Sequence, residues 1–120
     1  MVKHLNKESF QDRVYDFEKD ASNWNFKGDK PCIIDFYADW CGPCKTLGPI
    51  LDELSRDYEG KVDIYKIDTE QERDLSAAFG IRSIPSILFV PVDGQPQMVA
   101  GLLPKNELEK VIAEILKVEK

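Results

Sequence analysis

Two cysteines three residues apart follow directly on an apolar run, and this arrangement limits what the chain can fold into more than any other feature. The run spans residues 32–38 (Cys-Ile-Ile-Asp-Phe-Tyr-Ala) and leads through Asp39 into Trp40-Cys41-Gly42-Pro43-Cys44. If the run is a buried strand and a helix begins at Cys41, Cys44 lies one turn further along the same helical face. The two sulfurs then meet, so the sequence predicts a dithiol–disulfide redox site at a strand–helix junction.

Hydrophobic spacing predicts alternating helices and strands along the chain. We expect helices over roughly 7–20, 41–60, 69–79 and from Pro104 through Leu116, and strands over 32–38, 62–67, 86–90 and 97–101. Thr69-Glu70-Gln71-Glu72 fits a capping box that would open the third helix. The order favours an α/β domain whose central strands are parallel, with one antiparallel hairpin that turns at Asp93-Gly94.

Length and charge exclude several classes of function. The chain has 120 residues, of which 42% are apolar, and this is enough for one domain with its own core. The net charge of −6 argues against nucleic acid or an anionic membrane as a partner, and no apolar run approaches the roughly 20 residues of a spanning helix. Residues 1–20 lack a signal-peptide core. A cytosolic chain is the simplest interpretation, although an exported chain without its leader would look the same.

The position of the two cysteines predicts their roles. A thiolate, rather than a thiol, attacks a disulfide. At the first turn of a helix, Cys41 would face unpaired backbone N–H groups and the positive end of the helix dipole, which stabilise the thiolate. We therefore expect Cys41 to be the exposed nucleophile and Cys44, partly covered, to be the resolving thiol. Gly42 would let the chain turn tightly and Pro43 adds rigidity without charge, which favours a reductant over an oxidant.

Two other uses of such a cysteine pair fit the sequence less well. A zinc site needs further ligands, and the other candidates are His4 and Cys32, which an extended run should hold roughly 25–30 Å from Cys41. No metal is therefore expected. A structural disulfide that never exchanges is disfavoured by the short loop and the exposed helix start. Cys32 is interpreted as a small core residue, with a regulatory or dimer-forming thiol as the alternative.

Three further residues allow two interpretations each. Asp35 interrupts the apolar run, and it is either an exposed strand position or a buried base behind the cysteines whose pKa would rise. Lys66, in the next strand, is either its partner or an ordinary charged residue. Trp40 is either a core aromatic or a surface ring that packs against a partner protein. The sequence does not show whether the Ile84–Pro85 bond before the third strand is cis.

Several segments together match one known pattern. They are Asp35-Phe36-Tyr37-Ala38-Asp39-Trp40-Cys41-Gly42-Pro43-Cys44-Lys45, Pro49, Tyr65-Lys66-Ile67-Asp68, Phe79-Gly80-Ile81-Arg82-Ser83-Ile84-Pro85-Ser86, Gly94 and Gly101. Over about residues 32–118 the chain thus resembles the thioredoxin family, with mild departures at Tyr37, Asp39, Ser83 and Ser86. The resemblance implies a thioredoxin fold, in which helices flank both faces of a central mixed β-sheet. It implies a single domain over 1–120, with an N-terminal helix and a longer loop in 1–31.

The resemblance also implies roles for individual residues. Pro85 should be cis and lie against the cysteines, and the backbone at Ile84 should pair with a substrate chain. Asp35 should be the buried proton acceptor for Cys44, with Lys66 nearby. The residues expected to border the docking surface are Trp40, Gly42, Pro43, Ser83, Ile84, Pro85 and Gly101.

The function that the resemblance implies is that of a protein disulfide reductase. Electrons would pass from thioredoxin reductase, a flavoprotein fed by NADPH, through the Cys41–Cys44 pair to disulfide-bearing target proteins. The chain itself should carry no cofactor, and we expect a cytoplasmic monomer, with a periplasmic or secreted protein as the alternative. Two other functions stay open. One is an oxidase or isomerase, which Gly42-Pro43 disfavours, and the other is a redox-independent binding module, which the intact cysteine pair disfavours.

Overall fold

One mixed sheet forms the centre of the computed structural model, which describes residues 2–19 and 23–120. Across the sheet the strands come in the order β1 (Lys3–His4), β3 (Asp63–Asp68), β2 (Cys32–Tyr37), β4 (Ser86–Val90) and β5 (Gln97–Ala100). The first three are parallel, whereas β4 is antiparallel to β2 and β5 is antiparallel to β4. The predicted parallel centre and the terminal hairpin are therefore confirmed.

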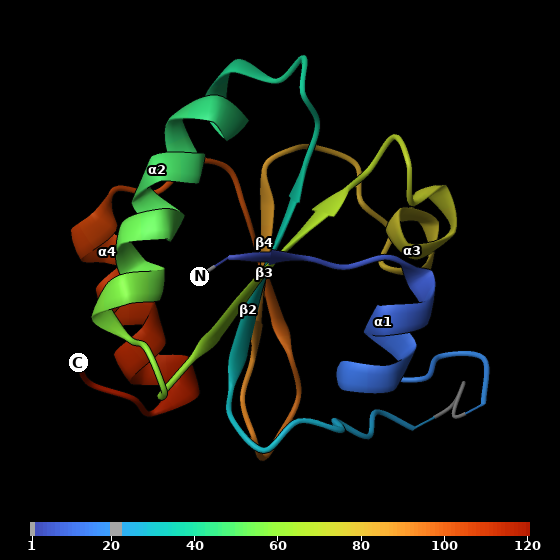
Figure 1. Cartoon of the computed structure of the whole chain (residues 1–120), viewed down its shortest axis with the longest axis horizontal. Helices are drawn as coiled ribbons and strands as arrows, with labels where there is room; N and C mark the ends of the chain where they lie inside the picture. Colours follow the sequence, from blue (N-terminus) through green and yellow to red (C-terminus); the bar gives the residue numbers. More distant parts are fainter. Residues whose placement is uncertain (1, 20–22) are drawn as a thin grey trace.

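Helices cover both faces of this sheet, as expected. Figure 1 shows α1 (Lys7–Arg13) and α3 (Arg73–Ala78) on one side, and α2 (Gly42–Asp57) and α4 (Lys105–Val111) on the other. A π-helical segment, Ile112–Leu116, continues α4. None of the helices formed by the described residues is both long and apolar enough to cross a membrane.

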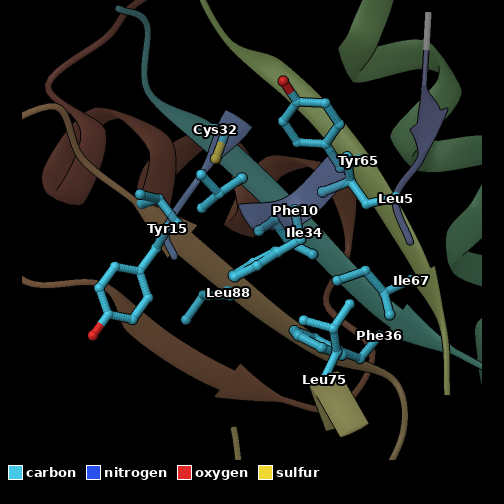
Figure 2. Close-up of a cluster of buried hydrophobic side chains, with 12 residues drawn as sticks. Leu5, Phe10, Tyr15, Cys32, Ile34, Phe36, Tyr65, Ile67, Leu75 and Leu88 are labelled. Atoms are coloured by element: carbon cyan, nitrogen blue, oxygen red, sulfur yellow. The ribbon is translucent and has the colours of Figure 1, made fainter. Parts of the chain in front are cut away.

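Alternate residues of β2 enter two separate cores. Cys32, Ile34 and Phe36 pack in a cluster with residues of α1 and α3, which Figure 2 shows. Ile33 packs in the opposite cluster, with residues of α2 and α4. Since side chains alternate between the faces of a strand, Asp35 belongs to the face that α2 covers.

The short edge strand β1 was not predicted from the sequence. Its two residues pair with Tyr65 and Lys66 of β3, and both are exposed. A strand of two exposed residues has no hydrophobic alternation that a sequence pattern can register. Its position matters below because it places His4 beside Lys66.

The first helix is shorter than the predicted 7–20, because three hydrogen bonds involve the residues that follow it. The carbonyl of Val14 accepts a hydrogen bond from the N–H of Lys27. The carboxylate of Asp16 accepts the N–H groups of Glu18 and Lys19, a turn that competes with helix. The helix therefore ends at Arg13. The predicted helix end at 20 and the predicted loop at 21–22 lie outside the described residues.

The predicted capping box at Thr69–Glu72 is wrong. α3 begins at Arg73, and no side chain caps it. The Thr69 hydroxyl instead donates to the carbonyl of Tyr37 at 3.0 Å, and a Glu72 carboxylate oxygen accepts the N–H of Lys7 at 3.0 Å. Both side chains thus connect the segment before α3 to other elements, β2 and α1, rather than to their own helix.

Candidate active site

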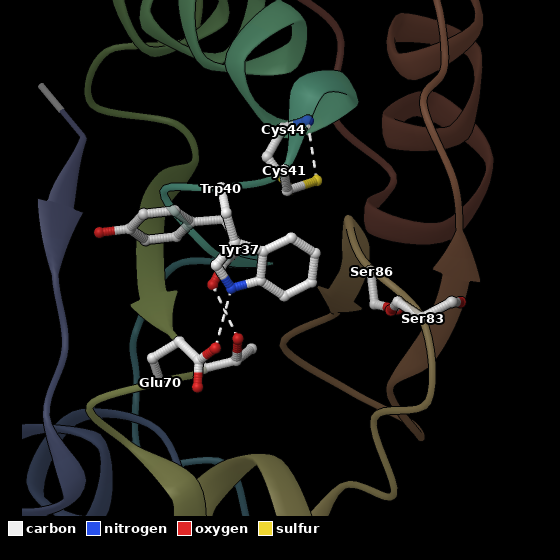
Figure 3. Close-up of a disulfide and its surroundings, with 8 residues drawn as sticks. Tyr37, Trp40, Cys41, Cys44, Glu70, Ser83 and Ser86 are labelled. Atoms are coloured by element: carbon white, nitrogen blue, oxygen red, sulfur yellow. Dashed lines mark hydrogen bonds between the residues drawn. A yellow bond between two sulfur atoms is a disulfide. The ribbon is translucent and has the colours of Figure 1, made fainter.

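The cysteine pair lies where the strand–helix junction was predicted. Cys41 is the N-cap of α2, and Pro43 and Cys44 lie in the first turn of the helix. The two cysteines form a disulfide with their Cα atoms 5.3 Å apart. The N–H of Cys44 also donates to the Cys41 sulfur at 3.2 Å, as Figure 3 shows. The backbone at the helix start therefore offers a hydrogen bond to this sulfur, which a thiolate would accept more strongly than a thiol.

The predicted exposure of Cys41 is wrong for the disulfide form. Cys41 is 4% exposed and Cys44 is 5% exposed. Both pack in a small cluster with Ala38, and Tyr37 and Ile84 lie against that cluster. The sulfurs are therefore covered by neighbouring side chains.

Gly42 does not serve the tight turn that the sequence suggested. A Cβ atom placed there would meet no heavy atom within 4 Å, and the backbone φ is not positive. Neither conformation nor packing within the chain requires glycine at this position. Gly42 and Pro43 are both exposed, so they form accessible surface beside Cys41.

The loop before β4 lies against the cysteines and is held by two hydrogen bonds. The Ile84–Pro85 bond is cis, as the resemblance implied. The Ser86 hydroxyl donates to the carbonyl of Ser83 at 2.6 Å, and the N–H of Gly101 donates to the carbonyl of Pro85 at 2.8 Å. Gly101 has φ +97, a conformation that side-chain-bearing residues rarely adopt. The two bonds tie the loop to β4 and to the end of β5.

Trp40 is a surface residue and borders an open groove. Its side chain is 70% exposed, and the indole N–H donates to a Glu70 carboxylate oxygen at 2.8 Å (Figure 3). With Ser83 and Ile84 it lines a groove of about 410 Å³ along α3. The groove also contains Glu70 and Arg73, which the sequence analysis did not select. Their only sequence signal is their place near the start of a helix that follows a strand.

The residues predicted for docking fall into two groups that differ in how accessible they are. Trp40, Ser83 and Ile84 line the groove, and Gly42 and Pro43 are exposed at the helix start. Pro85 is buried, and Gly101 is half-buried behind it.

Asp35 is a buried carboxylate rather than an exposed strand position. It has no exposed surface, and neither carboxylate oxygen has a hydrogen-bond partner among the described residues. Burial raises the pKa of Asp35 to about 7, and the positive charge of Lys66 opposes that rise. Lys66 is the register partner of Asp35 on β3. The structure thus brings these two residues together on neighbouring strands.

A second cavity is lined by both Lys66 and Cys44. It measures about 310 Å³, and Tyr37, Cys44 and Lys66 are among the residues that line it. Lys66 thus links the two residues, because it lies opposite Asp35 in the register of the sheet and lines one cavity with Cys44.

Comparison with known proteins decides the family. The thioredoxin family model matches residues 1–114. The chain belongs to the thioredoxin family. It is therefore a thiol–disulfide oxidoreductase of the thioredoxin type, an electron carrier whose redox-active pair is Cys41–Cys44.

Curated relatives support the same family. The chain is 48% identical over 114 residues to a thioredoxin of Borreliella burgdorferi, and the matched region covers 95% of this chain and 97% of the relative. A thioredoxin of Chlorobaculum thiosulfatiphilum is 39% identical over 100 residues, and the matched region covers 79% of this chain and 93% of the relative. An M-type chloroplastic thioredoxin of Spinacia oleracea is 36% identical over 98 residues, and the matched region covers 79% of this chain and 54% of the relative.

The third cysteine of this thioredoxin-family chain is remote from the redox pair. Cys32 starts β2 and packs on the face that α1 and α3 cover, whereas the redox pair follows the other end of that strand. His4, the other proposed zinc ligand, is exposed on β1. In residues 2–19 and 23–120, no three His, Cys, Asp or Glu side chains are grouped so that they could hold a metal ion.

Proposed function

We propose that this thioredoxin-family chain is a protein disulfide reductase that carries electrons from a reductase to disulfide-bearing target proteins. The observation that carries the proposal is the Cys41–Cys44 disulfide at the start of α2. It occurs together with a buried carboxylate, Asp35, that has no hydrogen-bond partner among the described residues. A dithiol at a helix start can attack a disulfide, and a nearby buried base can activate its second thiol.

In the first step, the Cys41 thiolate of the reduced chain attacks one sulfur of the target disulfide. A bond forms between Cys41 and that sulfur, the target S–S bond breaks, and the other target sulfur leaves as a thiolate. The N-cap position of Cys41 supports this role, because backbone N–H groups and the helix dipole stabilise the thiolate.

In the second step, Cys44 resolves the mixed disulfide. The Cys44 thiol gives its proton to the Asp35 carboxylate and its sulfur attacks Cys41. The Cys41–Cys44 bond forms as the bond to the target breaks, so the target leaves with two more electrons and the chain is left oxidised. A pKa of about 7 suits Asp35 to exchange a proton near neutral pH. Lys66 favours the charged carboxylate.

Target proteins would dock around the cysteines. The proposed docking surface consists of the residues that the sequence analysis selected, Trp40, Gly42, Pro43, Ser83, Ile84, Pro85 and Gly101. The exposed indole of Trp40 supplies apolar area on one side. On the other side, the backbone at Ile84 would pair with an extended target segment by strand addition.

The electron donor proposed for this chain is thioredoxin reductase, the NADPH-fed flavoprotein. Its two electrons would restore the dithiol, and the chain itself would bind no cofactor. We further propose that residues 1–120 form a single domain that acts as a cytoplasmic monomer, without a nucleic acid or membrane partner. The net charge of −6 supports the last point.

The test is insulin reduction with NADPH and a thioredoxin reductase, comparing the parent chain with Cys41→Ser and with Cys32→Ala as the matched control. Rapid reduction should persist in the control and vanish in Cys41→Ser, while Cys44→Ser should trap targets as mixed disulfides. Fast reduction with dithiothreitol but none with the reductase would indicate a different donor and favour an exported protein. Failure with both donors would favour a redox-independent binding module.

A further inference from the structure

Three side chains that can carry charge form a row across neighbouring strands. In the register of the sheet, Asp35 of β2 lies opposite Lys66 of β3, and Lys66 lies opposite His4 of β1. Residues that pair in this way point to the same face of a sheet. The row therefore runs from the buried carboxylate through a half-buried ammonium to an exposed imidazole.

The ring of Tyr37 covers this row. Tyr37 follows Asp35 by two residues and so projects from the same face of β2. The Lys66 ammonium lies 4.6 Å from the centre of the ring, a cation–π contact. The hydroxyl of Tyr37 lies 3.3 Å from Nδ1 of His4, and the two rings meet edge to face. Figure 3 shows the phenol ring extending toward the side where β1 lies.

Several carboxylates lie in the same part of the structure as Lys66. Asp39 and Asp52 line the same cavity as Lys66, and Asp68 lies at the end of β3. Burial and the charges of Asp68 and Asp39 raise the pKa of the Tyr37 hydroxyl. Among the described residues Lys66 nevertheless forms no ion pair, and its recorded contact is with the ring.

On β4, the register partner of Asp35 is the apolar Ile87. Among residues 2–19 and 23–120, Lys66 is the one charged group that lowers the pKa of the Asp35 carboxyl. Lys45, the other cation that lines the cavity, lies beyond Cys44 on the exposed side of α2. Burial has the larger effect on the Asp35 carboxyl, and the place of the Lys66 ammonium sets how far that effect is opposed.

We propose that Tyr37 is a positioning residue for the second exchange step, because its ring holds the Lys66 ammonium beside Asp35 and His4 holds the ring. This inference rests on the proposed role of Asp35 as the proton acceptor for Cys44. Without the ring, Lys66 is released to the exposed carboxylates of Asp39 and Asp52, and the ionised form of Asp35 loses its cation.

The test is a titration of the Asp35 carboxyl carbon by ¹³C NMR in the oxidised protein, without any target. Tyr37→Leu should raise the midpoint of this titration by about half a pH unit, since it removes a contact of cation–π strength. Tyr37→Phe keeps the aromatic face for Lys66 and the edge-to-face contact with His4, so its midpoint should stay near that of the parent. If Tyr37→Leu does not fold, Tyr37→Met supplies the same comparison.

A second background shows whether the effect acts through Lys66. In Lys66→Met the midpoint should already be raised, and adding Tyr37→Leu should raise it no further. An unchanged midpoint in Tyr37→Leu, or an equal rise in the Lys66→Met background, would overturn the proposal. Turnover is measured separately. A raised midpoint with unchanged turnover would support the positioning of Lys66 and count against the proposed role of Asp35.

Discussion

The cysteines at the start of β2 and beyond its end are similarly hidden but chemically different. Cys32, at the start of the strand, is 1% exposed, whereas Cys41 and Cys44, which follow its end, are 4% and 5% exposed. Exposure therefore does not distinguish the redox pair from the third cysteine. What differs is the polar structure that surrounds each sulfur.

Cys32 has surroundings that oppose a thiolate. It packs with Ile34 and Val90 in the core that α1 covers, and burial together with the charge of Asp63 raises the pKa of its thiol. Cys41 instead lies at a helix start and receives the N–H of Cys44. Since both sites are buried, we infer from the comparison that the partners available to the anion distinguish the reactivity of the two kinds of cysteine.

The largest expected effect is on the rate of alkylation. In the reduced protein at pH 7.5, iodoacetamide should modify Cys41 at least about a thousandfold faster than Cys32, because the thiolate is the reacting form. Peptide mass spectrometry after timed quenching measures both rates in one sample. In denaturant the two rates should converge. If Cys32 reacts within tenfold of Cys41 in the folded chain, the comparison fails.

The next effect concerns Asp35, the other hidden polar group of β2. Its pKa is raised from 3.8 to about 7, so between these values the folded chain binds a proton that the unfolded chain has released. Binding of this proton stabilises the folded state. The stabilisation is complete below pH 3.8 and is lost as the pH rises through 7. Linkage makes the loss about 4 kcal/mol.

Asp35→Asn removes this titration. The variant should unfold at higher urea concentration than the parent at pH 8.5, and the advantage should shrink toward pH 4. Urea unfolding of the oxidised parent and variant at pH 8.5 and at pH 4 measures this difference in stability. Cys32→Ala, the matched control at the other end of the strand, should show no comparable change with pH. An Asp35→Asn advantage that is the same at both values would contradict the raised pKa.

The same contrast explains what could be predicted from the sequence. Hydrophobic spacing and the cysteine pair were enough to predict the strands other than β1, the presence of the helices and the strand–helix junction, because these depend on local periodicity. The burial of Cys41 was missed, because it depends on Ile84, which is 43 positions away in the chain yet packs on the disulfide. The predicted capping box at Thr69 is wrong for a similar reason, since the Thr69 hydroxyl donates a hydrogen bond to the carbonyl of Tyr37 in β2. The role of Asp35 stayed open because alternation fixes its face but not what covers it.

A smaller effect is expected from Cys32→Ser. The substitution places a hydroxyl among apolar side chains, where a polar group without a partner costs about 1–3 kcal/mol. Unfolding in urea at pH 7 measures the loss, and Cys32→Ala separates the polar contribution from the change in volume. Insulin reduction by both variants should match the parent. Slower reduction in Cys32→Ala would mean that the two ends of β2 are coupled.

The smallest effect is expected at the rim of the redox site, where Glu70 accepts the indole N–H of Trp40 and pairs with Arg73 at 3.3 Å. All three side chains are exposed, and exposed polar contacts contribute little. Glu70→Ala should therefore raise the KM for insulin by about twofold through a more mobile Trp40, with kcat unchanged. Arg73→Ala, which keeps the bond to Trp40, should leave the KM unchanged. A fall in kcat in Glu70→Ala would show that the rim acts on the exchange chemistry as well as on docking, so that the surroundings that activate Cys41 would extend beyond the helix start.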